Sequence, residues 1–247
     1  MARRLRDVFY LNAFPEENKI IYYGMELREF LNCTPIELNN LLLLNAEYYG
    51  RGFSSHTKLE VVDSEEMEHF SQEDVYSYGN FCWIDYNQKE NIEKLEPPEI
   101  AELLYLGHML SPVNSPFFEK LDNRYTYLAH DDGWYCKLYC KYYDDLKEII
   151  ANKIIGMAST SKRRKIYPFS EELKEKLLTL AIDGLIIDFS NTQKYERSIE
   201  IPIHTIGKFD NMDEMYNGLR RHIGRSNYSA SLVHKNKKWV IDYEIRK

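Results

Sequence analysis

The residues in this chain that point most clearly to chemistry are two histidines and two neighbouring aspartates: His108, His130, Asp131 and Asp132. Histidine and aspartate side chains together are typical ligands of the metal ions that activate water in hydrolases. A metal-dependent hydrolase using His108, His130 and Asp131 is therefore one hypothesis. It requires these side chains to converge in one cleft.

Four cysteines, Cys33, Cys82, Cys136 and Cys140, offer a second kind of metal ligand. If residues 136–140 form a strand, the first and last Cα atoms are ~13 Å apart, since a strand advances ~3.3 Å per residue. A tetrahedral zinc site with Zn–S bonds of ~2.3 Å does not span that distance. Reduced, buried cysteines acting as small apolar groups are the favoured interpretation, and no metal or other cofactor is predicted.

Two basic clusters raise a third possibility, a regulator that associates with nucleic acid. The clusters are Lys162–Lys165, and Arg220, Arg221, His222 and Arg225 near the end of a predicted helix. Cations at a helix C-terminus also have a structural explanation in the helix dipole. The chain carries 39 acidic against 32 basic residues, a net charge of −7, which disfavours nucleic acid as the partner.

The strongest local pattern is a hairpin over residues 124–142, with Asp132-Gly133 as its turn. This turn pairs His130 with Tyr135 and Ala129 with Cys136, and it sends the side chains of His130 and Asp131 to opposite faces. The divergence argues against a shared metal ion. One face is apolar; the other is mostly polar and supplies the binding candidates Arg124, His130, Tyr135, Lys137 and Tyr139.

Other patterns predict alternating helices and strands. Helices are expected over residues 25–31, 34–45, 99–109 (apolar face Ile100, Leu103, Leu104 and Leu106), 171–182 and 212–223. Strands are expected over residues 58–62, 80–86, 185–189 and 199–206, with a terminal hairpin at 229–245 turning at 235–238, and residues 63–74 as a solvated helix or loop. The helix beginning at Thr34 lacks Arg and Lys, which argues against a DNA-reading helix.

Together these elements predict an α+β fold of mixed helices and antiparallel hairpins, arranged as two small packed subdomains. Residues 1–157 form the first unit, residues 158–165 a basic linker and residues 166–247 the second unit. No stretch of ~20 apolar residues is present, as a bilayer span requires. The basic N-terminus lacks an apolar segment behind it, so we expect no secretory signal and a cytoplasmic location.

Four segments, Asn80–Tyr86, Glu99–Met109, Ser115–Phe118 and Asn123–Tyr135, resemble a family of uncharacterised soluble bacterial proteins. Some members of that family carry an automatic "oxalate–formate antiporter" label. The resemblance covers about residues 80–145, and it implies neither an activity nor a catalytic residue. A transporter needs several apolar spans, and this sequence has none.

No nucleophile elbow, phosphate-binding loop or zinc-protease motif is present. Twenty tyrosines, side chains common on strands and at recognition surfaces, accompany the acidic charge. We therefore expect a non-catalytic protein that binds another protein, for instance as an inhibitor or an immunity-type modulator of a defence effector. The sequence does not predict the oligomeric state.

Overall fold

The computed structural model describes residues 7–46, 52–73, 79–130, 133–159, 166–209 and 211–243. Within these residues one antiparallel sheet organises the chain. Its strands are β1 (Val8–Phe14), β2 (Lys19–Tyr23), β3 (Leu41–Asn45), β4 (Gly52–Phe53), β5 (Glu60–Val62), β6 (Phe81–Asp85), β7 (Tyr125–His130), β8 (Tyr135–Cys140), β9 (Leu185–Asp188), β10 (Gln193–Lys194), β11 (Ser198–Thr205), β12 (Tyr228–Lys235) and β13 (Lys238–Asp242). The expected α+β class is confirmed.

The strand order is β13-β12-β11-β9-β1-β2-β8-β7-β6-β3-β5-β4, with β10 paired to β11. Strand β1 lies between β2 and β9, and its residues Val8–Leu11 pair with Leu185–Asp188. The sheet therefore runs without a break across the predicted boundary between the two units. Residues 160–165 of the predicted linker lie outside the described residues, and the division into subdomains stays a prediction.

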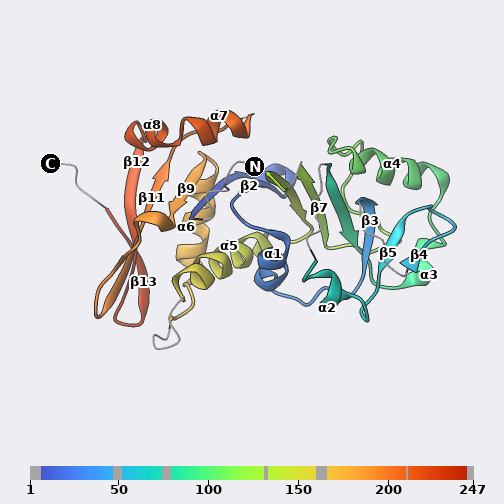
Figure 1. Cartoon of the computed structure of the whole chain (residues 1–247), viewed down its shortest axis with the longest axis horizontal. Helices are drawn as coiled ribbons and strands as arrows, with labels where there is room; N and C mark the ends of the chain where they lie inside the picture. The colour runs from blue at the N-terminus through green and yellow to red at the C-terminus, as the bar shows by residue number, and fades with distance from the viewer. Residues whose placement is uncertain are drawn as a thin grey trace.

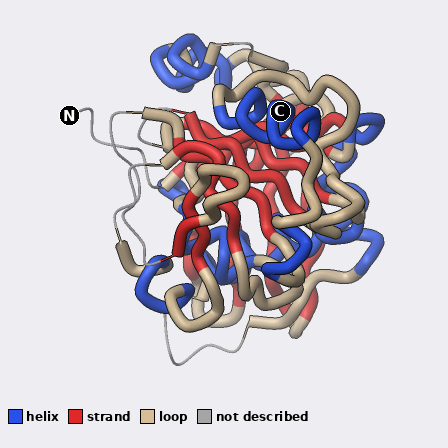
Figure 2. The backbone as a smooth tube through the Cα atoms, turned by 90° about the vertical axis from the view of Figure 1, so that its right-hand side faces the viewer, coloured by secondary structure: helices blue, strands red, loops and turns tan. Residues whose placement is uncertain are grey.

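Helices cover both faces of the sheet (Figures 1 and 2). The helices of the lower layer in Figure 1 are α1 (Leu27–Cys33), α2 (Met67–Phe70), α5 (Tyr143–Ala158) and α6 (Glu171–Ala181). The other face is covered by α3 (Lys89–Ile92) and α4 (Pro97–Gly107) at one end and by α7 (Met212–Asn217) and α8 (Leu219–Gly224) at the other. Within the described residues no helix has both the length and the apolar character needed to cross a bilayer.

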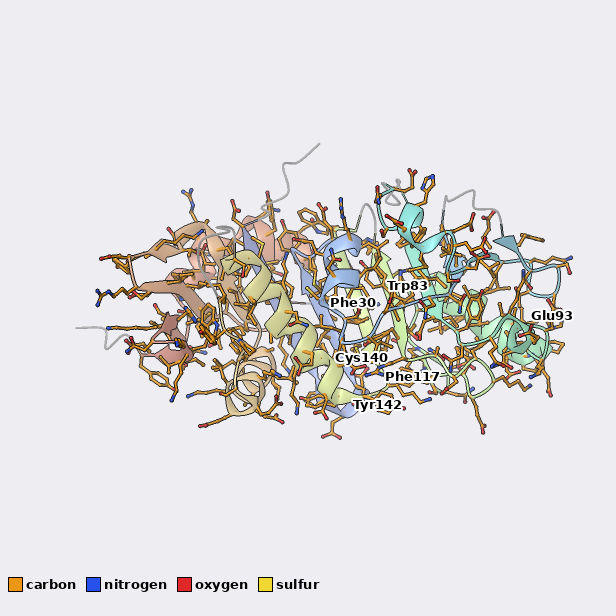
Figure 3. The ribbon with its side chains drawn as sticks, turned by 90° about the horizontal axis from the view of Figure 1, so that it is seen from below. Phe30, Trp83, Glu93, Phe117, Cys140 and Tyr142 are labelled. Atoms are coloured by element: carbon orange, nitrogen blue, oxygen red, sulfur yellow. The ribbon has the colours of Figure 1, made fainter. Side chains whose placement is uncertain are left out.

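The main core lies between the sheet and the lower layer. Phe30 of α1 packs against Trp83 and Tyr127, with ring centroids 5.9 and 5.1 Å apart, and Trp83 stacks on Tyr127 at 5.0 Å. Figure 3 looks onto this layer and shows Phe30 beside Trp83, with Tyr142 at the start of α5. Because side chains alternate along a strand, the intervening residues pack into two smaller clusters on the opposite face.

The predicted helix over residues 34–45 is wrong, because Leu41–Asn45 is strand β3. All four leucines, Leu41 to Leu44, are buried, two on each face of the sheet. A strand with helices on both faces buries every side chain of a short apolar run, whereas an amphipathic helix buries only one stripe. Thr34, expected to start a helix, instead ends α1, and its hydroxyl donates to the carbonyl of Leu31.

The predicted hairpin is confirmed as β7–β8. His130 pairs with Tyr135 and Ala129 with Cys136, and Gly133 has a φ of +63°. The backbone N–H of Trp134 donates to the carbonyl of His130 at 2.8 Å, so Trp134 belongs to the turn. Asp131 and Asp132 lie outside the described residues.

The C-terminal part matches the expected order of elements, with one break. The helix expected over residues 171–182 is α6, and Ser170 caps it by accepting a bond from the N–H of Leu173. The single helix expected over residues 212–223 is wrong, since α7 and α8 meet at Gly218. The terminal hairpin is confirmed as β12–β13, with Asn236 and Lys237 at φ of +52° and +65°, as a two-residue turn of type I′ requires.

Candidate functional site

Helix α4 is fixed at its start by a reciprocal cap. Pro97 occupies the first turn, where no N–H is needed, and the N–H of Glu96 donates to the Glu99 carboxylate at 2.7 Å. Lys120 donates to the same carboxylate at 2.7 Å. Burial opposes ionisation of Glu99, but these two donors outweigh it, so the pKa of Glu99 is lowered.

Helix α4 carries two apolar faces. Leu103 and Leu106 are fully buried against the sheet, as predicted. Leu104, which was predicted to belong to that buried face, is 44% exposed, and this part of the prediction is wrong. Tyr105 beside it is 42% exposed. Both point away from the core because they lie on the side of the helix opposite Leu103 and Leu106.

Exposed residues recur along this side of the helix, and the loop after it carries further exposed apolar residues. Ala101, Leu104, Tyr105 and His108 follow the i, i+3, i+4, i+7 spacing of one helix face, and all are exposed. Leu110 and Val113 of the following loop are 42% and 68% exposed. We call these six residues, Ala101, Leu104, Tyr105, His108, Leu110 and Val113, the α4 face.

The loop that carries Leu110 and Val113 is held against the helix. Glu102 accepts from the backbone N–H of Asn114 at 2.9 Å and from its side-chain amide at 3.3 Å. At the helix end, the carbonyl of Met109 accepts from the Lys137 ammonium at 2.9 Å. Met109 has a left-handed φ of +63°. The α4 face is therefore a preformed surface.

Lys137 connects the predicted hairpin residues to this surface. Its side chain is half-buried. Burial is the larger cause of its lowered pKa, and the nearby charge of Lys19 is the smaller. Tyr139 is buried, and Tyr135 is half-buried between the two clusters on this face of the sheet. His130 lies 4.9 Å from Tyr135, ring to ring. These four binding candidates thus lie together, with Lys137 reaching the end of α4.

Arg124 is engaged within the fold. Its guanidinium makes two bonds of 2.5 Å to Asp145, whose side chain is 4% exposed, and stacks on the Tyr142 ring at 4.9 Å. The Tyr125 hydroxyl donates to the same carboxylate at 2.9 Å. This bidentate geometry positions the start of β7 against α5.

Asp85 holds the backbone at the same place. Its carboxylate accepts from the N–H of Arg124 at 2.9 and 3.0 Å and from the N–H of Tyr125 at 2.6 Å. Burial raises the pKa of Asp85 to about 6, against the opposing effect of these donors. The cluster is a buried support for the hairpin.

Arg220, Arg221 and Arg225 are exposed on or just after α8. Helix α8 lies at the left of Figure 1 and α4 at the right, so these arginines are separate from the α4 face. Residues 162–165, the other basic cluster, lie outside the described residues. The nucleic-acid hypothesis, which needs both clusters on one face, stays a prediction.

The positions of His108 and His130 add no support to the metal hypothesis. His108 is exposed at the C-terminal end of α4, and His130 is half-buried at the end of β7. Asp131 lies outside the described residues, and the described part of the chain contains no group of three His, Cys, Asp or Glu residues arranged to hold a metal ion. The hydrolase hypothesis stays a prediction.

The four cysteines are free and buried, as the sequence indicated. Burial raises the pKa of the Cys33 thiol to about 11 and that of Cys82 to about 12. Burial likewise raises the pKa values of Cys136 and Cys140 above the ordinary range. Thiols of this kind are poor nucleophiles, since the thiolate is the reactive form.

No family model, curated protein or solved structure matches the chain. The resemblance of residues 80–145 to an uncharacterised bacterial family therefore stays a prediction. The α4 face is a feature of the surface that the sequence patterns did not predict. An available signal was that Leu103 to Leu106 is apolar all round, more than a one-sided helix needs.

Proposed function

We propose that this chain is a non-catalytic protein that binds another protein through the α4 face. The observation that carries the proposal is the exposure of Leu104, Tyr105, Leu110 and Val113, by 42–68%, on a helix and loop held in place by Glu102 and Lys137. Exposed apolar side chains that gather on one surface mark interaction sites more often than scattered ones do.

The apolar character of the α4 face indicates what kind of partner would fit. Glu99 and Glu102 lie one turn before Leu103 and Leu106, on the same side of the helix as those buried leucines, and Glu99 is paired with Lys120. A partner that presents apolar side chains would complement this surface. A rigid surface loses little conformational freedom on binding, which favours affinity.

An inhibitor or immunity-type modulator acting in the cytoplasm fits these properties. Such a protein needs a preformed surface and no reacting groups. Four free, buried cysteines are consistent with a reducing compartment.

Quantitative affinity capture from source cells tests the proposal. The bait proteins would be the unmodified chain, the double variant Leu104→Ser/Tyr105→Ser and the control Tyr195→Ser, whose side chain is 49% exposed elsewhere. We expect a stoichiometric protein partner with the first and third baits, and at least about tenfold less with the double variant, because apolar anchors dominate binding energy.

Thermal unfolding of the three baits would confirm that all are folded, since the substituted side chains are exposed. The proposal fails if no stoichiometric partner is recovered, or if the double variant retains the partner as well as the control does.

A further inference from the structure

The two ends of the sheet differ in a way that bears on assembly. At one end the edge strand β4 has two residues, Gly52 and Phe53. At the other end the edge strand β13 has five residues, Lys238–Asp242, and among the described residues it pairs on one side only, with β12. A strand of that length with one unpaired side is a template for a further strand.

The direction of the backbone groups in β13 follows from its turn. Asn236 and Lys237 form a two-residue turn, so Lys235 and Lys238 are a hydrogen-bonded pair. Bonding to β12 then recurs at every second residue. The N–H and C=O groups of Trp239 and Ile241 therefore point outward from the sheet.

A proline in the neighbouring strand supports this alternation. Pro202 of β11 faces Ser231 of β12. In the same alternation Ser231 directs its backbone groups toward β13, so Pro202, which has no N–H, stands where β11 forms no bond to β12.

The side chains of β13 alternate between two environments. Trp239 is buried, packs on Phe169 at 5.0 Å and donates its indole N–H to the carbonyl of Tyr167 at 2.8 Å. On the opposite face Lys238, Val240 and Asp242 are exposed, Val240 by 51%. The strand is thus anchored on its core face and open on the other.

These features form a self-complementary pattern. Two β13 strands placed antiparallel around Val240 would bring Trp239 of each copy opposite Ile241 of the other, where all four outward N–H groups find outward carbonyls. The same register sets Lys238 of each copy beside Asp242 of the other. Among the described residues neither Lys238 nor Asp242 has an ion-pair partner.

Other antiparallel registers lose this match. A shift of the two-fold axis to Ile241 places Asp242 opposite Val240, and a shift to Trp239 places Lys238 opposite Val240. Only the axis at Val240 joins opposite charges and keeps the apolar side chains facing each other.

We propose that the occupant of this edge is a second copy of the chain, paired through β13 around a two-fold axis at Val240. The resulting contact is isologous and closed, as in most symmetric dimers. Helix α4 lies at the far end of the sheet (Figure 1), so both α4 faces stay free. The inference does not depend on the proposed function.

Charge reversal tests the register. Lys238→Glu would place two like-charge pairs across the axis, and we expect the dimer dissociation constant from analytical ultracentrifugation to rise about tenfold or more. The double variant Lys238→Glu/Asp242→Lys would restore opposite charges, and its dissociation constant should return to within about threefold of the unmodified chain. Both positions are exposed, so the fold should tolerate the changes.

Oxidative cross-linking gives a second readout. In the proposed register the Cα atoms of residue 240 in the two copies are about 4.5 Å apart, within disulfide range, whereas those of residue 238 are ~13 Å apart. Val240→Cys should therefore form a covalent dimer under mild oxidant and Lys238→Cys should not, while the four native cysteines stay buried. A chain that is monomeric at every accessible concentration, a dimer that Lys238→Glu leaves unchanged, or equal cross-linking of the two cysteine variants would overturn the proposal.

Discussion

Replacing Asp85 by Asn should change how the stability of this protein depends on pH. The Asp85 carboxyl is 7% exposed and accepts backbone N–H groups from Arg124 and Tyr125. Its pKa rises from 3.8 to about 6, mainly because burial disfavours the charged form. An Asn side chain keeps an oxygen that can accept from the same N–H groups, but it does not ionise.

The sign follows from proton binding. Between pH 3.8 and about 6 the folded state binds more protons at this carboxyl than the unfolded chain does. The free energy of unfolding therefore falls as the pH rises through this window, and the loss is complete above it. A pKa difference of one corresponds to about 1.4 kcal/mol, so the full loss is about 3 kcal/mol. About 2 kcal/mol of it should develop between about pH 4.5 and about pH 7.

Urea unfolding of the unmodified chain and of Asp85→Asn, at several pH values across this range, measures the effect. We expect the free energy of unfolding of the unmodified chain, minus that of the variant, to fall by about 2 kcal/mol from low to high pH. Asp183→Asn, at an exposed position, controls for the type of substitution. A difference that stays constant with pH would refute the reasoning. A difference that grows with pH would show that the N–H donors outweigh burial.

Three further predictions concern the fold. Asp145→Ala should lower the free energy of unfolding by about 2–3 kcal/mol, because it leaves Arg124 and the hairpin without their buried carboxylate. In the same denaturation assay the control Asp144→Ala, at a carboxyl that is 85% exposed, should lower it by less than about 1 kcal/mol. Gly184→Ala should destabilise the fold by more than about 2 kcal/mol, since Gly184 has a φ of +72° and a Cβ there would meet a backbone oxygen at 1.8 Å. Gly156→Ala in α5, with open space around it, should instead stabilise the fold by about 0.5–1 kcal/mol. The four cysteines should react with a thiol reagent only in denaturant; rapid labelling of the native protein would contradict their burial.

Local signals in the sequence predicted the elements that have clear start and stop residues. The β7–β8 register followed from one turn, and the helices expected over residues 99–109 and 171–182 match α4 and α6 to within two residues. The strand β3 was not predicted, because four successive leucines fit a helix or a strand equally well until the neighbouring elements are known. Gly218 divides α7 from α8, although an isolated glycine costs a helix only about 1 kcal/mol.

The surface features were harder to predict than the elements. Leu104 belongs to a run of apolar residues, and only the packing of α4 on the sheet decides which of them remain exposed. The site candidates on the hairpin were predicted to share a face, and His130, Tyr135, Lys137 and Tyr139 do lie on one. That Lys137 binds the end of α4 depends on a contact 28 residues away in the chain, which periodicity does not encode.

The position of β1 between β2 and β9 has a consequence for synthesis on the ribosome. Strand β9 is translated about 175 residues after β1, which takes on the order of 10–35 s at ~5–20 residues per second. Until then the nascent chain exposes one side of an apolar strand, Val8–Phe14, to other chains in the cell. Chaperones that bind nascent apolar segments should therefore affect the yield of this protein more than its final stability.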